Sequence, residues 1–177
     1  MPKLSPALFV ALQDQSAVIK VAGRANFTSS VDFKTLVSEL QCRGITRFLL
    51  DLTECITMDS TFLGVLAGLA IKLDGKADGN HQPMLELLNP NARVTDLLDN
   101  LGVCNLFKIT QGPQFAGTLQ PIASERNSTK RERVETCLEA HRTLMGANPE
   151  NVPKFKEVTH FLVEDLKKLD QAEGAHG

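Results

Sequence analysis

The chain has 177 residues and a mass of 19.3 kDa, which is enough for one well-buried domain with an appendage but too little for two full domains. Hydrophobic residues make up 42% and charged residues 23%, and the formal net charge of -2 argues against nucleic acid as a partner. No apolar run approaches the roughly 20 residues that a membrane span requires, and residues 1–6 lack the apolar core of a signal peptide. We therefore expect a cytoplasmic protein without direct membrane insertion.

The N-terminal part begins with two short apolar runs. Residues 7–12 and 17–22 are separated by a polar turn, which predicts a β-hairpin. A Gly-containing break follows, and then a helical pattern in which Ser29 or Ser30 is the candidate cap. This helix is expected to end near Gly44.

The next segment contains the strand-to-helix turn that is the most informative part of the chain. Residues 46–52 predict a buried strand, and a polar turn then leads to an apolar helix that begins around Ser60. Gly64 and Gly68 lie four residues apart in this helix, and small residues at that spacing predict close packing on a sheet. A polar loop is expected over residues 72–82.

The pattern of strand and helix continues beyond this loop. Residues 83–88 predict a strand, 92–101 an amphipathic helix closed by Gly102, and 106–109 a last short strand. Strands that alternate with helices favour an α/β fold, and the initial hairpin indicates a mixed sheet. We expect the helices to pack mainly on one face of it.

The C-terminal part has a different composition. Gly, Pro, Ser, Thr and Asn dominate between residues 111 and 130, which predicts a linker, and two amphipathic helical patterns follow, with His141 on the apolar side of the first. The expected organisation is a domain over 1–112, a linker over 113–130 and a helical hairpin over 131–173.

Metal and cofactor chemistry find no support in the sequence. The four cysteines and four histidines are scattered, with no C-x-x-C or H-x-x-x-H spacing, so buried free thiols are expected instead of a zinc site. The sequence has neither a G-x-x-x-x-G-K-[ST] loop nor a G-x-G-x-x-G pattern after a strand, the two glycine patterns that bind nucleotides, and we expect no cofactor. The cysteines are Cys42, Cys55, Cys104 and Cys137.

The turn at Asp59, Ser60 and Thr61 places two hydroxyls at a helix start. Unpaired backbone N–H groups and a partial positive charge make such a position suitable for an N-cap hydroxyl or for a phosphate. Ser60 has no flanking glycines of a nucleophile elbow and no evident histidine partner, which argues against a serine hydrolase. Asp51, Glu54 and Asp59 lie near one another in sequence, and we prefer helix capping to an acidic metal site as the role of Asp59.

At these residues the chain resembles a known family. Asp51-Leu52, Met58-Asp59-Ser60-Thr61 and Leu63-Gly64-Val65-Leu66 are similar to the signature of STAS domains, as in anti-sigma-factor antagonists of the SpoIIAA type. The resemblance spans residues 5–110 and includes the turn before Asn26 and the closing helix and strand over 89–109.

The resemblance implies a STAS-type mixed sheet and a protein that is not an enzyme. In that family the serine aligned with Ser60 is phosphorylated by a partner that is both a serine protein kinase of the histidine-kinase-like ATPase type and an anti-sigma factor. The unphosphorylated antagonist binds that partner. ATP would then belong to the partner, Ser60 would be the phosphoacceptor, and Thr61 would be a secondary acceptor or a cap.

Two departures from the family signature affect the expected interface. Phe62 replaces a glycine, so its ring either packs under the helix or projects beside Ser60, and Asn26 replaces the customary aspartate. We expect Asn26, Asp59, Ser60, Phe62 and Leu63 to contact the partner. The C-terminal hairpin could cover the sheet or could serve dimerisation or partner binding, and the sequence leaves both open.

The sequence thus predicts an anti-sigma-factor antagonist-like phosphoswitch in a partner-switching pathway of transcription regulation. The alternative, from another functional class, is a non-phosphorylated STAS subunit of a membrane complex for lipid transport. A third possibility, a small-ligand sensor, has no motif to support it.

Overall fold

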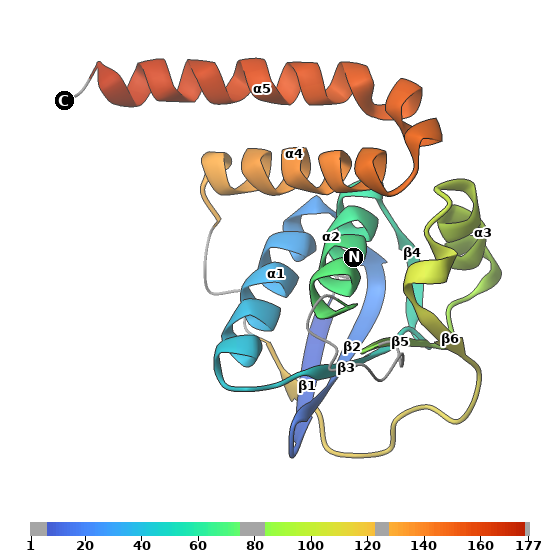
Figure 1. Cartoon of the computed structure of the whole chain (residues 1–177). Helices are drawn as coiled ribbons and strands as arrows, with labels where there is room; N and C mark the ends of the chain where they lie inside the picture. Colours follow the sequence, from blue (N-terminus) through green and yellow to red (C-terminus); the bar gives the residue numbers. More distant parts are fainter. Residues whose placement is uncertain (1–6, 75–83, 123–127, 176–177) are drawn as a thin grey trace, which may run out of the picture.

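The computed structural model describes residues 7–74, 84–122 and 128–175. Within these ranges one mixed sheet has the strand order β6-β5-β3-β2-β1-β7, and β4 pairs with β2 beyond this path (Figure 1). The strands are β1 (Ala7–Gln13), β2 (Ser16–Ala25), β3 (Arg47–Asp51), β4 (Cys55–Met58), β5 (Leu85–Leu88), β6 (Lys108–Thr110) and β7 (Gln120–Pro121).

The predicted hairpin is confirmed. Strands β1 and β2 pair antiparallel from Ala7 opposite Ala22 to Gln13 opposite Ser16, which leaves a two-residue turn. Asp14 in this turn has a φ of +52°, a left-handed conformation that a short polar side chain tolerates. The other neighbours of β2 run parallel to it, as the alternation of strands and helices requires.

Strand β4 was not predicted from the sequence, where its residues were assigned to a polar turn. It pairs with the last part of β2, with Met58 opposite Ala25, after β2 has finished pairing with β3. Four residues with only Cys55 and Met58 buried give too short an apolar pattern to be recognised. The strand matters because it brings the starts of two helices together.

The helices form layers on the sheet (Figure 1). Helices α1 and α2 lie next to the sheet, α4 packs across both of them, and α5 packs on the outside of α4. This arrangement confirms the expected mixed α/β fold with a C-terminal pair of helices. The bounds are α1 (Phe27–Cys42), α2 (Ser60–Asp74), α3 (Ala92–Asn100), α4 (Lys130–Ala147) and α5 (Val152–Gly174), with 3₁₀ segments at Cys104–Leu106 and Pro149–Asn151.

Several local predictions need correction. The cap of α1 is Asn26, not Ser29 or Ser30: its side-chain oxygen accepts from Ser29 N at 3.2 Å, and Ser29 Oγ accepts from Asn26 N at 2.9 Å. Gly44 and Gly102 close their helices with φ values of +90° and +66°, as predicted.

Other boundaries shift by a few residues. The loop predicted over 72–82 falls mostly outside the described residues, and its first three residues belong to α2. The strand expected at 106–109 begins two residues later, because a 3₁₀ turn precedes β6. Inside the predicted linker, Ile122 N donates to the Leu8 carbonyl at 2.8 Å, so β7 returns the chain to the edge of the sheet.

The described helices include none that is long and apolar enough to cross a membrane. All four cysteines are free, but only one is buried as predicted: Cys55 is buried, Cys42 is exposed and the other two are half-buried.

Candidate functional site at the start of helix α2

The turn between β4 and α2 is held by Asp59. Its Oδ1 accepts from Phe62 N at 2.8 Å, and its carbonyl accepts from Leu63 N at 3.1 Å, so Asp59 is the cap of α2. The prediction that Asp59 serves in capping is confirmed, whereas the alternative that Ser60 caps the helix is wrong. Ser60 is the first helical residue, and its side chain is available for a contact elsewhere.

That contact is with a histidine from the C-terminal part of the chain. Ser60 Oγ lies 2.9 Å from His141 Nε2, although 81 residues separate them. His141 Nδ1 lies 2.6 Å from the Cys137 carbonyl, which can only accept, so Nδ1 carries a proton. In the neutral imidazole Nε2 is therefore an acceptor, and Ser60 Oγ–H donates to it.

His141 itself is enclosed by the helical pair. Its side chain is 4% exposed, and its ring packs edge-on against Phe155 of α5 with 4.9 Å between the ring centroids. No histidine partner for Ser60 was expected from the sequence, and the structure corrects this. The only signal was the position of His141 on the apolar side of α4, which does not say which surface that side covers.

Thr61 makes the neighbouring contact. Its Oγ1 lies 3.3 Å from Cys137 Sγ, and the residue is 4% exposed. Burial raises the pKa of the Cys137 thiol, the Thr61 hydrogen bond opposes this shift, and the negative charge of Asp59 adds to it. The thiol is thus kept protonated beside the start of α2.

Helices α2 and α4 approach very closely one turn further on. A Cβ added to Gly64 would lie 2.4 Å from the Ala140 carbonyl oxygen, whereas one added to Gly68 would meet nothing nearer than Thr143 at 3.8 Å. The small residues at this spacing were expected to pack on the sheet, and the structure corrects this, because they face α4. Only glycine fits at residue 64 with the helices at this distance.

The ring of Phe62 packs under the helix. Phe62 is fully buried, with its ring centroid 5.2 Å from that of Phe33, and Leu63 is 1% exposed. The expectation that Phe62 and Leu63 contact a partner stays a prediction, and it requires that the packing around them change. A glycine at this position would leave part of the core between α1 and α2 unfilled.

Asn26 and Asp59 cap neighbouring helices. Asp59 N donates to the Ala25 carbonyl at 2.9 Å, so the two caps lie side by side where β2 and β4 end. Both residues are half-buried. The structure thus brings together Asn26, Asp59 and Ser60 among the predicted interface residues.

The acidic residues before α2 have separate roles. Asp51 is buried and accepts from Thr53 N at 3.0 Å and from Phe115 N at 3.1 Å, while Glu54 pairs with Lys20. Among the described residues no group of three or more His, Cys, Asp or Glu side chains is placed to hold a metal ion.

The Ser60–His141 pair has the contact of a nucleophile and its base, but lacks the rest of a hydrolytic site. Nδ1 is oriented by a backbone carbonyl instead of a carboxylate, and the N–H of Phe62 is used by Asp59. Neither Ser60 nor His141 lines the cleft between α1, α2 and α4. The pair joins helices α2 and α4.

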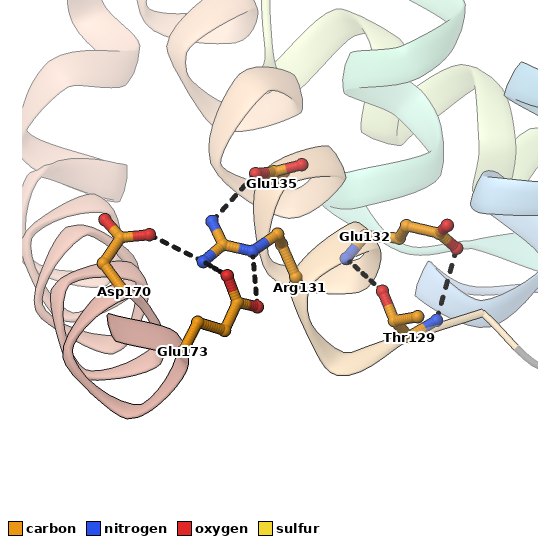
Figure 2. A network of polar contacts seen from close by, with 6 residues as sticks. All are labelled: Thr129, Arg131, Glu132, Glu135, Asp170 and Glu173. Atoms are coloured by element: carbon orange, nitrogen blue, oxygen red, sulfur yellow. Dashed lines mark hydrogen bonds and ion pairs between the residues drawn. The ribbon is translucent and has the colours of Figure 1, made fainter. Parts of the chain in front are cut away.

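The helical pair that carries His141 is itself connected at both ends. Figure 2 shows Arg131 at the start of α4, which donates to Glu173 Oε2 at 2.9 Å and to Asp170 Oδ1 at 2.6 Å near the end of α5. Glu135 on α4 lies 3.4 Å from the same guanidinium. These ion pairs raise the pKa of Arg131 and link the free ends of the two helices.

The turn between α4 and α5 is fixed to the end of α3 by Asn151. This fully buried residue donates from Nδ2 to the Leu101 carbonyl at 2.9 Å and to the Leu144 carbonyl at 2.8 Å. Nearby, Lys154 Nζ donates to the Asn100 carbonyl at 2.7 Å. The turn is thus attached to the end of α3.

Comparison with known proteins identifies the fold. The sequence profile of the STAS domain matches residues 10–116. The chain belongs to the STAS domain family. Helices α4 and α5 lie beyond the matched residues of this STAS protein.

Solved structures with the same fold include three anti-sigma factor antagonists. A putative one from Thermotoga maritima is 20% identical with a TM-score of 0.51, covering 59% of this chain and 85% of its own. Unphosphorylated SpoIIAA is 18% identical with a TM-score of 0.51, covering 59% of this chain and 88% of its own. An anti-sigma factor antagonist from Mycobacterium paratuberculosis is 15% identical with a TM-score of 0.50, covering 59% of this chain and 85% of its own. A search of curated proteins finds no significant match.

Proposed function

We propose that this STAS protein is a non-enzymatic phosphoswitch that resembles anti-sigma-factor antagonists and is controlled by phosphorylation of Ser60, with Thr61 as a secondary acceptor. The observation that carries the proposal is the position of Ser60 as the first residue of α2 in a STAS domain. Its partner is an anti-sigma factor with serine kinase activity, which supplies ATP. The surface for that partner comprises Asn26, Asp59 and Ser60, and the buried Phe62 and Leu63 join it when the packing around them changes.

The electrostatics at Ser60 suit a reversible modification. A phosphate there would carry about -1.5 to -2 charges and would meet the N-terminal N–H groups of α2 favourably. Asp59 directly precedes Ser60, and its carboxylate already accepts from the Phe62 N–H. Because both groups are negative, this carboxylate would repel the phosphate. These opposing effects allow phosphorylation to alter the surface without unfolding the sheet.

The test is phosphate mapping. The full chain is incubated with ATP and the kinase that co-purifies with it from the native cell, and the phosphorylated residue is located by mass spectrometry. We expect phosphate on Ser60, a smaller amount on Thr61, and loss of the main product in Ser60→Ala. Unmodified Ser60 and Thr61 would contradict the phosphoswitch.

A second function is favoured by one specific observation. The Ser60 hydroxyl is already bound to His141, as expected if this hydroxyl is structural and is not phosphorylated, and the alternative function is then that of a non-phosphorylated STAS subunit of a membrane complex for lipid transport. Affinity purification from native cells separates the two functions, because an ATPase and a permease would be recovered in place of a kinase and a sigma factor.

A further inference from the structure

Helix α4 lies on the side of α2 that carries Ser60. Three successive contacts join the two helices: Ser60 to His141 and Thr61 to Cys137, with Gly64 closely packed on Ala140 in the next turn. These residues form one strip along the first two turns of α2, which is the strip that a kinase or a partner would have to reach.

We propose that α4 and α5 are an intramolecular occupant of this α2 surface, and that the Ser60–His141 hydrogen bond is a latch which a phosphate on Ser60 opens. The inference rests on the proposed function for the source of the phosphate. The inference adds that α4 competes with a partner protein, because both would bind the same strip of α2.

A phosphate on Ser60 takes the place of the hydroxyl hydrogen that makes the contact with His141. Ser60 Oγ and His141 Nε2 are 2.9 Å apart, so no phosphorus atom with three further oxygens fits between them. The ester oxygen has no proton to donate, and the Asp59 carboxylate disfavours a second negative group beside it. A protonated His141 would attract the phosphate but would still have to move outward.

The transfer itself is conventional. A bond forms from Ser60 Oγ to the γ-phosphorus of ATP as the bond from that phosphorus to the bridging oxygen breaks. ADP leaves with the electron pair, and the hydroxyl proton passes to a base of the kinase. Because His141 covers the hydroxyl in the closed chain, the kinase must act on an opened form, and the phosphate then prevents reclosure.

The interface between α4 and the domain is close at Gly64 but incomplete beside it. A cleft of about 380 Å³ lies between α1, α2 and α4. Gln41 lines it, and its buried amide nitrogen has no hydrogen-bond partner among the described residues. The exposed ion pair of Lys34 with Glu139, at 2.5 Å, spans the same gap. An interface with such a void loses contacts that a well-packed core would keep, so separating it costs less.

The far end of α4 provides the pivot. Leu144 is fully buried and Asn151 fixes the adjoining turn to the end of α3, so this end stays attached. At the other end of α4, Arg131 pairs with Asp170 and Glu173 of α5. Opening would therefore swing the part of α4 that precedes Leu144, including Cys137 and His141, away from Ser60 together with α5.

The experiment measures amide hydrogen exchange in the full chain with phosphoserine incorporated genetically at residue 60. We expect exchange over residues 131–141 to rise by about tenfold or more relative to the unmodified chain, while β2, β3 and β5 keep their protection. Phosphoserine at exposed Thr28, in the first turn of α1, is the matched control and should leave α4 unchanged.

A second variant covers failure of the modified chain to fold. Ser60→Asp carries a charge at the same place and should also raise exchange over 131–141 selectively. Unchanged protection of α4 in these chains, or a rise throughout the sheet, would overturn the latch. Since no kinase is used, this result is independent of whether Ser60 is phosphorylated in the cell.

Discussion

Ser60 and His141 form a buried polar pair whose two members depend on each other. Replacing Ser60 with alanine leaves His141 Nε2 enclosed without a donor, and a buried polar atom that loses its partner costs about 1–3 kcal/mol. We expect Ser60→Ala to lower the free energy of unfolding by an amount in this range. Urea denaturation of the full chain measures it.

A double-mutant cycle separates this pair from its surroundings. His141→Phe keeps a ring against Phe155, and when it is combined with Ser60→Ala, the loss should be smaller than the sum of the two single losses by about 0.5–2 kcal/mol. Strictly additive losses would show that the hydrogen bond contributes nothing beyond packing.

Cys55 makes stability depend on pH in the alkaline range. Burial raises the pKa of this thiol from 9.0 to about 11, and it is 3% exposed. A folded-state pKa above the unfolded value gives stability that is complete below pH 9 and is lost as pH rises toward 11. We expect a loss of about 1 kcal/mol between pH 8 and pH 10.

The control for this prediction is Cys55→Ala. The variant lacks the titrating thiol, so its unfolding free energy should fall less over the same pH interval, even though its stability at pH 7 is lower. Cys104, whose pKa is also raised to about 11 by burial and by Asp99, contributes equally to both proteins. Parallel pH profiles would contradict the assignment to Cys55.

At the scale of single residues, the sequence was informative where the cause is local. Gly44 and Gly102 end helices because their backbone is left-handed, and Asp59 caps α2 because an acceptor precedes three free N–H groups. The burial of Phe62 was not predictable, because it depends on Phe33 from another helix. The contact of His141 with Ser60 was likewise not predictable, because it depends on how α4 packs on α2.

At the scale of helices, Gly64 and Gly68 offer a matched pair of variants. Both changes to alanine should favour the helical backbone by roughly 0.5–1 kcal/mol, so any difference between them reports the contact with α4. Gly64→Ala would push its Cβ into the Ala140 backbone, whereas Gly68→Ala has room. We expect only Gly64→Ala to displace α4.

Alkylation of Cys137 provides the readout for this pair. The thiol is shielded between the helices and its pKa is raised by burial, so it should react slowly with iodoacetamide at pH 8 in the closed protein. Gly64→Ala should accelerate the reaction at Cys137, mapped by peptide mass spectrometry, while exposed Cys42 reacts equally in both variants. Equal rates at Cys137 would mean that α4 does not move.

Long helices were predicted correctly from the spacing of their apolar residues, whereas the shortest strands were missed. The sixteen residues of α1 and the twenty-three of α5 give clear periodicity, whereas β4 has four residues and β7 has two. Strand β7 was hidden inside the predicted linker for the same reason. Such short strands form because their neighbours are already in place.

At the scale of the whole molecule, the resemblance to STAS domains gave the sheet and the position of Ser60, and the matched profile confirms the family. The docking of α4 could not be predicted, since its contacts with α2 join residues 76 and 81 positions apart. An amphipathic side indicates that a helix is covered but not by what. The proposed latch rests on these long-range contacts.

The closed state can be trapped with a single substitution. Thr61 Oγ1 is 3.3 Å from Cys137 Sγ, so Thr61→Cys should form a disulfide to Cys137 under mild oxidation and hold α4 on α2. Closing a loop of this length should raise stability by about 4 kcal/mol if the geometry is unstrained. Thr61→Ser, which keeps the hydroxyl, is the control.

The trapped chain tests whether opening must precede recognition. Oxidised Thr61→Cys should be phosphorylated at Ser60, and should bind the co-purifying kinase, far more slowly than its reduced form, and dithiothreitol should restore both. The Thr61→Ser control should be insensitive to oxidant. If the oxidised and reduced chains react at the same rate, α4 does not compete for the start of α2, and the partner recognises another face of the domain.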